Sequence, residues 1–241
     1  MRILAIDTAT ENCSAALWLE GQLLQRAQRL ERGHAQIILQ LVDELLTEVG
    51  FGLSGFSAIA FGRGPGAFTG VRLAASVAQG LAFGAGLPVV PVSDLQALAL
   101  RALNEDRAIG RVLVCADARM REVYWASFER TAESLAGRCS EERVSPPADV
   151  RLPSAWPPGG HAGSPLPHAQ QDPGRLAGVG SGFAAYPELR GNLDLDLVLE
   201  GLLPSAAEVA QLAVLEVAAG RILPPEQALP VYLRDDVARP Q

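Results

Sequence analysis

Short apolar runs separated by polar turns open the chain. Residues 3–6 form an apolar run that stops at Asp7, and residues 13–19 and 23–30 are two further segments that are typical of strands. The turn Glu20-Gly21-Gln22 separates these two segments. The pattern therefore predicts a buried strand with a polar loop at its carboxyl end, followed by a hairpin.

A helical period follows over residues 34–49, and Gly50 stands where a C-terminal cap is expected. Its apolar positions are Ile37, Ile38, Leu41, Val42, Leu45, Leu46 and Val49. Leu39 falls outside this stripe and widens the apolar arc to roughly 200°. Two interpretations stay open: the helix is well buried, or its far edge meets a second protein.

A glycine-rich loop then joins an apolar strand at 57–61 to a helix expected over 68–85. Small residues form two rows spaced by four along this helix, namely Gly70, Ala74, Ala78 and Ala82, and Ser76, Gly80 and Gly84. Such rows let another helix backbone come close. The loop formally resembles a dinucleotide fingerprint, but Pro65 removes one N–H donor and the chain opens with a meander rather than a βαβ unit.

The opening pattern recurs in the second half. Residues 111–116 are an apolar run that ends at Asp117, and 122–129 return as a hairpin partner. A second glycine turn ends the strand expected near 177–182. This recurrence predicts a duplicated lobe. Asp7 and Thr8 with Asp117 would then resemble the metal–nucleotide site of an actin-like ATPase, which gives the alternative of an ATP-dependent phosphotransferase. The competing interpretation is that these are turns of the fold without a ligand.

The composition excludes several classes of enzyme chemistry. The chain has 241 residues and a net charge of −7, and all 20 of its basic residues are Arg. Without Lys there is no P-loop lysine and no Schiff-base lysine. An acidic chain is also a poor stand-alone nucleic-acid binder. Three widely spaced Cys and an apolar strand at the N-terminus predict a cytoplasmic location without a signal segment.

Metal and membrane sites are not expected. The three His have no partner four residues on, so no metal site is predicted. The most apolar window, 71–92, contains Arg72, Gln79 and two Pro and is not a membrane span. Residues 145–175 are rich in Pro, Gly and Ser and predict a long surface segment that holds His161 and His168. The remaining expected elements are a strand at 195–199, a helix at 205–219 capped by Ser205, and a tail at 229–236 that docks on the surface.

Four ordered motifs resemble the TsaB (YeaZ) family. They are residues 1–10 (MRILAIDTAT), 62–72 (GRGPGAFTGVR), 117–125 (DARMREVYW) and 230–234 (PVYLR). The resemblance implies an α/β protein of the actin-like ATPase (sugar kinase/heat-shock) fold. Its two related lobes would span 1–106 and 107–241. It further implies a non-catalytic role in making N6-threonylcarbamoyladenosine (t6A) in tRNA.

The resemblance also implies partners and a binding surface. The catalytic paralogue TsaD would be bound through the helices 34–49 and 68–85 of the first lobe, with the ATPase TsaE as third member and tRNA reached only through the complex. The implied partner-binding residues are Leu39, Val42, Leu46, Gly70, Ala74, Ala78 and Leu81. No catalytic residue, metal or cofactor is expected in the chain. An ATP or ADP at the partner interface and a homodimer of the isolated chain are left open.

One sequence feature agrees with the non-catalytic role. In the catalytic paralogue, one helix carries two metal-binding His spaced by four. In the chain, that helix comes after the glycine-loop helix and one intervening strand. The matching stretch here, 91–98, has no His. A metal that activates a carbonyl or phosphoryl group needs such ligands. The Pro-rich segment and Arg121, where relatives often have a smaller residue, are departures from the family pattern.

Overall fold

A computed structural model describes residues 1–131, 135–156 and 174–234. Its contacts divide the chain into two units, the first made of residues 1–97 with 204–232 and the second of 98–203 with the tail from Leu233. This division differs from the expected boundary after residue 106. The boundary falls within the helix α3 (Asp94–Glu105), and residues 204–232 belong to the first unit.

The first unit is built on a five-stranded sheet with the order β3-β2-β1-β4-β5. Its strands are β1 (Arg2–Asp7), β2 (Asn12–Leu19), β3 (Gln22–Arg29), β4 (Ala58–Gly62) and β5 (Val89–Val92). The first three form the antiparallel meander that the sequence predicts, and β4 and β5 continue the sheet parallel to β1. The loops that follow β1, β4 and β5 therefore meet at one edge of the sheet.

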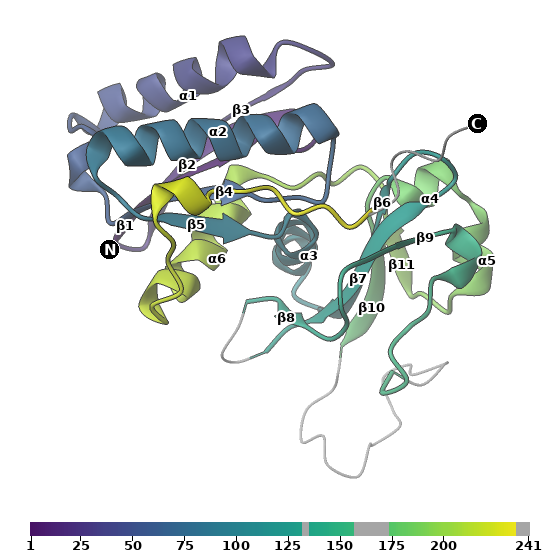
Figure 1. The fold of residues 1–241 in the computed structure, drawn as a ribbon. Coiled ribbons are helices and arrows are strands. Elements are labelled where there is room, and N and C mark those ends of the chain that lie inside the picture. The colour runs from purple at the N-terminus through teal and green to yellow at the C-terminus, as the bar shows by residue number, and fades with distance from the viewer. Residues whose placement is uncertain (132–134, 157–173, 235–241) are drawn as a thin grey trace. The chain divides into compact units, whose positions relative to one another are not determined.

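Helices cover both faces of this sheet (Figure 1). On one face lie α1 (His34–Val49) and α2 (Phe68–Ala85), on the other α6 (Ala206–Ala218). The core follows the alternation of the strands: Leu4 and Ile6 of β1 pack toward α1 and α2. Gly50 ends α1 in the left-handed conformation, as a C-terminal cap does. Two 3-10 turns, η1 (Leu53–Gly55) and η3 (Pro225–Gln227), lie at the surface of the same unit.

The placement of α6 differs from the sequence-based division, which assigned it to the second lobe. Polar side chains on the far face of β2 hold its start. The Ser14 hydroxyl accepts a hydrogen bond from the Ala206 N–H at 3.0 Å, and the Asn12 side chain donates to the Pro204 carbonyl at 2.9 Å. Ser205 caps the helix as expected, with its hydroxyl accepting from the Ala207 N–H.

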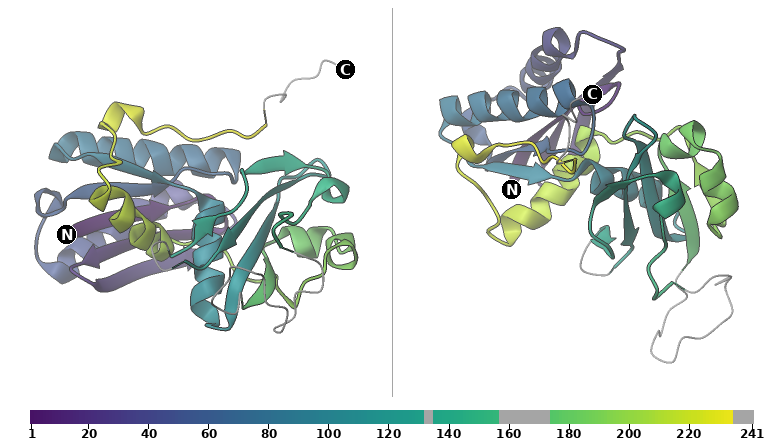
Figure 2. Two further views of the ribbon diagram at one scale, coloured as in Figure 1. Left: turned by 90° about the horizontal axis from the view of Figure 1, so that it is seen from below. Right: turned by 45° about the vertical axis from the view of Figure 1, so that its right-hand side comes forward.

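The second unit repeats the topology of the first. Its sheet has the order β11-β10-β6-β7-β8, with β9 also paired to β7. β6 is antiparallel to β7 and parallel to β10, as β1 is to β2 and β4. The elements are β6 (Ile109–Asp117), β7 (Val123–Glu129), β8 (Gly137–Arg138), β9 (Arg143–Ser145), η2 (Pro147–Asp149), β10 (Arg175–Val179), α4 (Gly182–Ala185), α5 (Glu188–Asn192) and β11 (Leu197–Leu199). The helices α4 and α5, green in Figure 2, cover one face of this sheet.

The α/β class and the two related actin-like lobes are confirmed by this repeat. The tail behaves as expected up to residue 234, because the Val231 N–H donates to the Arg63 carbonyl at 2.8 Å. Residues 235–236 of that prediction, and His161 and His168 of the Pro-rich segment, lie outside the described residues. Within the described part of the chain, no helix is long and apolar enough to cross a membrane.

One row of small residues on α2 is buried against the sheet. Gly70, Ala74, Ala78 and Ala82 belong to the interior of the first unit. A Cβ at Gly70 would lie far inside van der Waals distance of the Thr8 carbonyl oxygen. On the opposite side of the helix, a Cβ at Gly80 would meet nothing within 4 Å. The same residue type therefore has opposite packing environments at two positions of one helix.

We predict that the same substitution has opposite effects at these two glycines. Gly70→Ala destabilises the protein by about 2 kcal/mol, because the added methyl group has no space and the backbone must shift. Gly80→Ala stabilises it by up to about 1 kcal/mol, because alanine favours the helix and the site is open. Urea unfolding of both variants beside the wild type measures this. Equal signs at the two positions would contradict the packing described for α2.

Candidate functional site

The candidate site of the first unit lies where the loops after β1, β4 and β5 meet. The glycine loop between β4 and α2 has N–H donors of the kind that could hold a phosphate, and three of them donate to the chain's own groups. The Arg63 N–H donates to Val92, at 2.8 Å, and the Ala67 N–H to Ala9, also at 2.8 Å. The Gly64 N–H donates to the Asp94 carboxylate. Pro65 has no N–H to offer.

Two glycines bring this loop against the backbone that follows β1. A Cβ at Gly66 would lie 2.7 Å from the Ala9 carbonyl oxygen, and Gly70 meets Thr8 in the same way. The Thr8 hydroxyl donates to the Gly70 carbonyl at 2.7 Å. Thr8, a candidate nucleotide-binding residue, thus ties two loops of its own unit together. The backbone of Thr8 and Ala9 thus packs directly against the glycine loop and the start of α2.

Asp7, the second candidate nucleotide-binding residue, is fully buried and faces the carboxyl group of Asp94. One Asp7 oxygen accepts a hydrogen bond from the Ala9 N–H at 2.8 Å. Both carboxyl groups lie over Gly62, where a Cβ would be 2.5 Å from an Asp94 oxygen and 3.2 Å from the Asp7 carboxyl carbon. The absence of a side chain at Gly62 makes room for the pair.

Burial makes this pair share a proton. Burial raises the pKa of Asp7 to about 6, while the hydrogen bond from Ala9, the contact with Asp94 and the positive field of His34 oppose the rise. Burial, followed by the charge of Asp7, raises the pKa of Asp94 well above its usual value. Two carboxylates in contact cannot both ionise away from water. Losing both protons is therefore unfavourable, and the pKa values of both acids lie above their usual range.

Asp117, the third candidate nucleotide-binding residue, ends β6 in the second unit. One of its oxygens accepts hydrogen bonds from the Arg119 N–H at 2.8 Å and from the Tyr186 hydroxyl at 3.2 Å. The other oxygen forms an ion pair with the Arg119 guanidinium at 3.1 Å. Asp117 thus organises the turn after its own strand. Its pairing with Asp7 and Thr8 around a nucleotide stays a prediction, because they belong to the other unit.

The turn between β6 and β7 has an unusual backbone that the sequence pattern did not indicate. Arg119, Met120 and Arg121 have φ angles of 61°, 55° and 62°. The Glu122 N–H donates to the Arg119 carbonyl at 3.0 Å, so Met120 and Arg121 are the central residues of a tight hairpin turn. Asn and Gly normally fill such positions. A side chain in the left-handed region costs about 1–2 kcal/mol per residue.

The candidate partner-binding residues fall into two groups. One group is buried in the first unit and consists of Val42, Gly70, Ala74 and Ala78. Their small or apolar side chains pack on the protein's own sheet, and their part in partner binding stays a prediction. Leu46 and Leu81 are partly buried against the same core. Leu39 is 51% exposed, as expected for a residue outside the buried stripe.

The second row of small residues on α2 is the one that faces outward. Ser76, Gly80 and Gly84 are exposed, and a Cβ at either glycine would meet nothing within 4 Å. Phe83 lies on the same side of the helix and is 78% exposed. The sequence showed both rows, but it did not indicate which of them faces the sheet.

Aromatic residues at the start of α2 extend this outward surface. Phe68 is 56% exposed and Tyr232, in the tail, is 46% exposed. The Arg72 guanidinium lies 3.4 Å from the centre of the Phe68 ring, and its Nε donates to the Tyr232 hydroxyl at 2.6 Å. This arrangement holds an Arg and two rings in place at the surface. Arg and aromatic residues are enriched where proteins bind one another.

The described residues, which leave out 132–134, 157–173 and 235–241, contain no group of three His, Cys, Asp or Glu that could hold a metal ion. His34 begins α1, and its ring contacts the Thr10 carbonyl through Nε2 at 2.8 Å. Cys13 and Cys115 are buried, and burial raises the pKa of the Cys13 thiol to about 11. These thiols therefore pack as apolar side chains and are poor nucleophiles at neutral pH.

Comparisons with known proteins agree over nearly the whole chain. The family model described as TsaD, tRNA N6-adenosine threonylcarbamoyltransferase, matches residues 28–219. The tRNA threonylcarbamoyladenosine biosynthesis protein TsaB of Escherichia coli (strain K12) is 42% identical over 99% of this chain and 96% of its own length. TsaB of Haemophilus influenzae is 36% identical over 98% of this chain and 95% of its own.

A solved structure agrees as well. The crystal structure of a Pseudomonas aeruginosa protein described as similar to peptidase YEAZ has a TM-score of 0.86 at 42% identity. The match covers 97% of this chain and 99% of that chain.

We predict that removing one acid of the buried pair changes how stability depends on pH. An acid whose pKa rises on folding stabilises the fold at low pH, and this contribution is lost as pH rises through the folded-state pKa. For Asp7 the loss runs from its usual 3.8 to about 6, and for Asp94 it extends further upward. Asp94→Asn cannot ionise, so it should exceed the wild type in unfolding free energy at pH 7.5 by about 1 kcal/mol.

The difference between Asp94→Asn and the wild type should shrink toward pH 4, as measured by urea unfolding at several pH values. Asp43→Asn, on the exposed face of α1, is the matched control and should show no such trend. A difference that is constant with pH, or a less stable variant at pH 7.5, would show that the pair does not share a proton.

Proposed function

The chain belongs to the TsaB family of tRNA threonylcarbamoyladenosine biosynthesis proteins, and from this premise we propose that it is a non-catalytic subunit of a tRNA-modifying complex. Its role lies in the biosynthesis of t6A in tRNA. It binds a TsaD-type catalytic paralogue through the outward face of α2, works together with a TsaE-type ATPase, and reaches tRNA through the complex.

The observation that carries this proposal is the outward row of small residues on α2. A glycine inside a helix costs about 1 kcal/mol relative to alanine. At Gly80, the described chain places nothing within 4 Å of the missing side chain, so no internal contact offsets this cost. A partner's helix laid across Gly80 and Gly84 would use the absent side chains, because two helix backbones can then approach closely.

The residues around this row suit a protein interface. Phe83, Phe68 and Tyr232 are exposed aromatic side chains on or beside α2, and Leu39 is an exposed leucine of α1, which covers the same face of the sheet (Figure 1). Exposed apolar surface of this kind marks protein interaction sites. The binding surface proposed here consists of Leu39, Phe68, Ser76, Gly80, Phe83, Gly84 and Tyr232.

The non-catalytic role is supported by the loops at the end of the first sheet. The glycine loop donates to its own chain, and Thr8 and Asp7 bond within the unit. The helix α3, which occupies the place of the histidine-bearing helix of the catalytic paralogue, contains no His. These residues therefore hold the fold together and leave the chemistry to the partner.

We predict that Gly80→Leu abolishes complex formation without destabilising the chain. The leucine side chain fills the space that a partner helix would occupy, while it favours the helix by about 1 kcal/mol. Co-purification with the TsaD-type protein of the same organism measures binding, and thermal unfolding measures stability. Gly191→Leu is the matched control, because Gly191 is an exposed helical glycine of α5 with open space around it. Undiminished co-purification of Gly80→Leu would contradict the proposed interface.

Calorimetric titration separates this proposal from the alternative of an ATP-dependent phosphotransferase. Mg-ATP added to the isolated chain should give no binding heat, because three loop N–H groups donate within the protein and Asp7 is buried with one oxygen bonded to the Ala9 N–H. The complex with the TsaD-type protein serves as the comparison. Micromolar binding and turnover by the isolated chain would favour the phosphotransferase.

A further inference from the structure

The outward row of α2 continues toward the start of the helix as Phe68 and Arg72. Phe68, Arg72, Ser76, Gly80 and Gly84 follow one another at intervals of four residues, and all of them are exposed. Positions four apart lie on the same face of a helix. Arg72 lies about 12 Å along the helix axis from Gly80, at 1.5 Å per residue. A partner helix that lies along this row therefore covers Arg72 together with the two glycines.

Two aromatic rings hold the Arg72 guanidinium in place. It lies 3.4 Å from the centre of the Phe68 ring and 5.3 Å from the centre of the Tyr232 ring, and the two ring centres are 6.0 Å apart. Its Nε donates to the Tyr232 hydroxyl at 2.6 Å. The guanidinium is thus oriented before any partner arrives, which reduces the entropy lost on binding.

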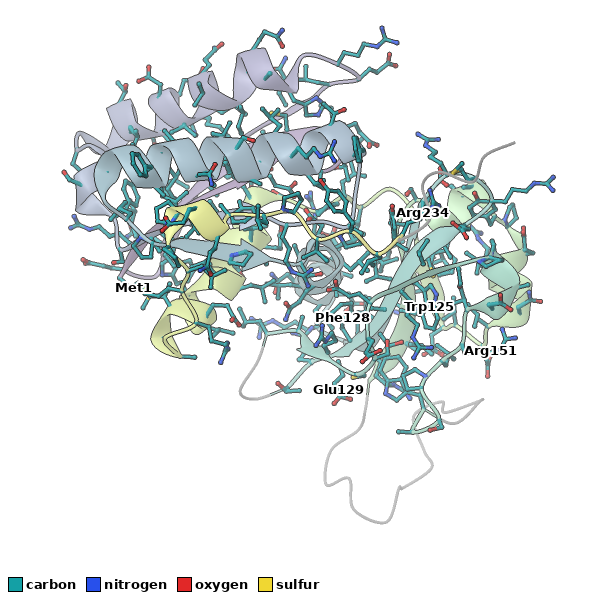
Figure 3. The ribbon with its side chains drawn as sticks, in the orientation of Figure 1. Met1, Trp125, Phe128, Glu129, Arg151 and Arg234 are labelled. Carbon is teal, nitrogen blue, oxygen red and sulfur yellow. The ribbon has the colours of Figure 1, made fainter. Side chains whose placement is uncertain are left out.

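The tail that carries Tyr232 is anchored along the chain on both sides of this residue. Before it, the Val231 N–H donates to the Arg63 carbonyl at 2.8 Å. After it, the guanidinium of Arg234, which Figure 3 labels, donates to the Ala118 carbonyl at 3.2 Å. The ring and hydroxyl that position Arg72 therefore belong to a fixed segment.

The charge of Arg72 has no carboxylate to balance it. Within the part of the chain that the structure describes, Arg72 forms no ion pair, and its two Nη groups have no hydrogen-bond partner. Water solvates this charge while the face of α2 is exposed. A partner that covers the row removes that water, and an unpaired buried charge is strongly unfavourable. A protein that docks along the row must therefore offer an anion to Arg72.

We propose that Arg72 pairs with a carboxylate of the TsaD-type protein and so fixes where that protein lies along α2. The Nε is engaged by Tyr232, so the carboxylate meets the two Nη groups, whose parallel N–H donors match its two oxygens. Aspartate and glutamate supply the anion at a protein surface. The net charge of −7 makes the polyanion tRNA a less suitable ligand for this face.

The test is a calorimetric titration of full-length variants with the purified TsaD-type protein, in the absence of nucleotide and tRNA. Arg72→Gln keeps much of the side chain but removes the charge, and it should weaken binding by about tenfold or more. Arg72→Lys keeps the charge without the planar fork and should weaken binding by about threefold. Tyr232→Phe keeps the ring but frees the guanidinium, with a loss of about threefold.

The matched control is Arg107→Gln. Arg107 is an exposed arginine between α3 and β6, and its replacement changes the net charge of the chain by the same amount. This variant should bind the TsaD-type protein as the wild type does. A loss equal to that of Arg72→Gln would show that only the overall charge matters, and it would overturn the proposed ion pair.

Charge exchange identifies the carboxylate. Arg72→Glu should weaken binding more than Arg72→Gln, because two carboxylates then face each other. Replacing the acidic residues of the TsaD-type protein's docking surface by arginine, one at a time, should restore the binding of Arg72→Glu at one position. Such a restored affinity cannot come from a change in the fold of the chain. Failure of every position to restore binding would overturn the proposal.

The ion pair rests on the proposed function, and the two fail differently. If the wild type does not bind the TsaD-type protein, or if Gly80→Leu binds it normally, the proposed function fails and the ion pair fails with it. If Gly80→Leu abolishes binding while Arg72→Gln binds as the wild type does, only the ion pair fails. It also fails if Arg72→Gln loses affinity only after Mg-ATP or tRNA is added, because the anion at Arg72 is then a phosphate.

Discussion

The close backbone contact between the loop after β1 and the glycine loop is the constraint on which the first unit depends. Gly66 and Gly70 have no side chain, so the carbonyl groups of Ala9 and Thr8 can approach them. The hydrogen bond from Thr8 to Gly70 then fixes the start of α2 relative to β1. Because α2 is fixed there, one of its small rows packs on the sheet and the other must face outward. A loop that resembles a phosphate cradle therefore acts as a structural joint, and it determines which face of α2 is exposed.

The sequence predicted much of the fold because local signals were strong. Apolar runs ending at Asp7 and Asp117 marked the first strand of each sheet, and the shared order of the two sheets confirms the duplication. The placement of α6 was not predictable in this way. Its bonds to Ser14 and Asn12 join residues that lie about two hundred positions apart, and the spacing of apolar residues in a helix does not show which sheet it covers.

The candidate sites were harder to predict, for two physical reasons. Both rows of α2 contain small residues, so periodicity identifies two faces without showing which is buried. A side chain at Gly70 would clash with the backbone, whereas the space at Gly80 is open. Only this difference shows which row is buried. The left-handed turn between β6 and β7 carries no sequence signal of its own, since Met and Arg rarely adopt that conformation. The hydrogen bonds of Asp117, Tyr186 and Arg234 around this turn join residues from distant parts of the chain.

The proton shared by Asp7 and Asp94 explains why the end of the first sheet suits a structural role better than a chemical one. A carboxylate that holds a metal–nucleotide must be ionised and must direct an oxygen toward the ligand. Asp7 directs one oxygen to the Ala9 N–H and faces Asp94, and burial raises the pKa of both carboxyl groups. Ionising both acids there would leave two buried charges in contact without a cation. The contacts of Asp7 and Asp94 therefore serve to join the strand ends and the glycine loop of the first unit.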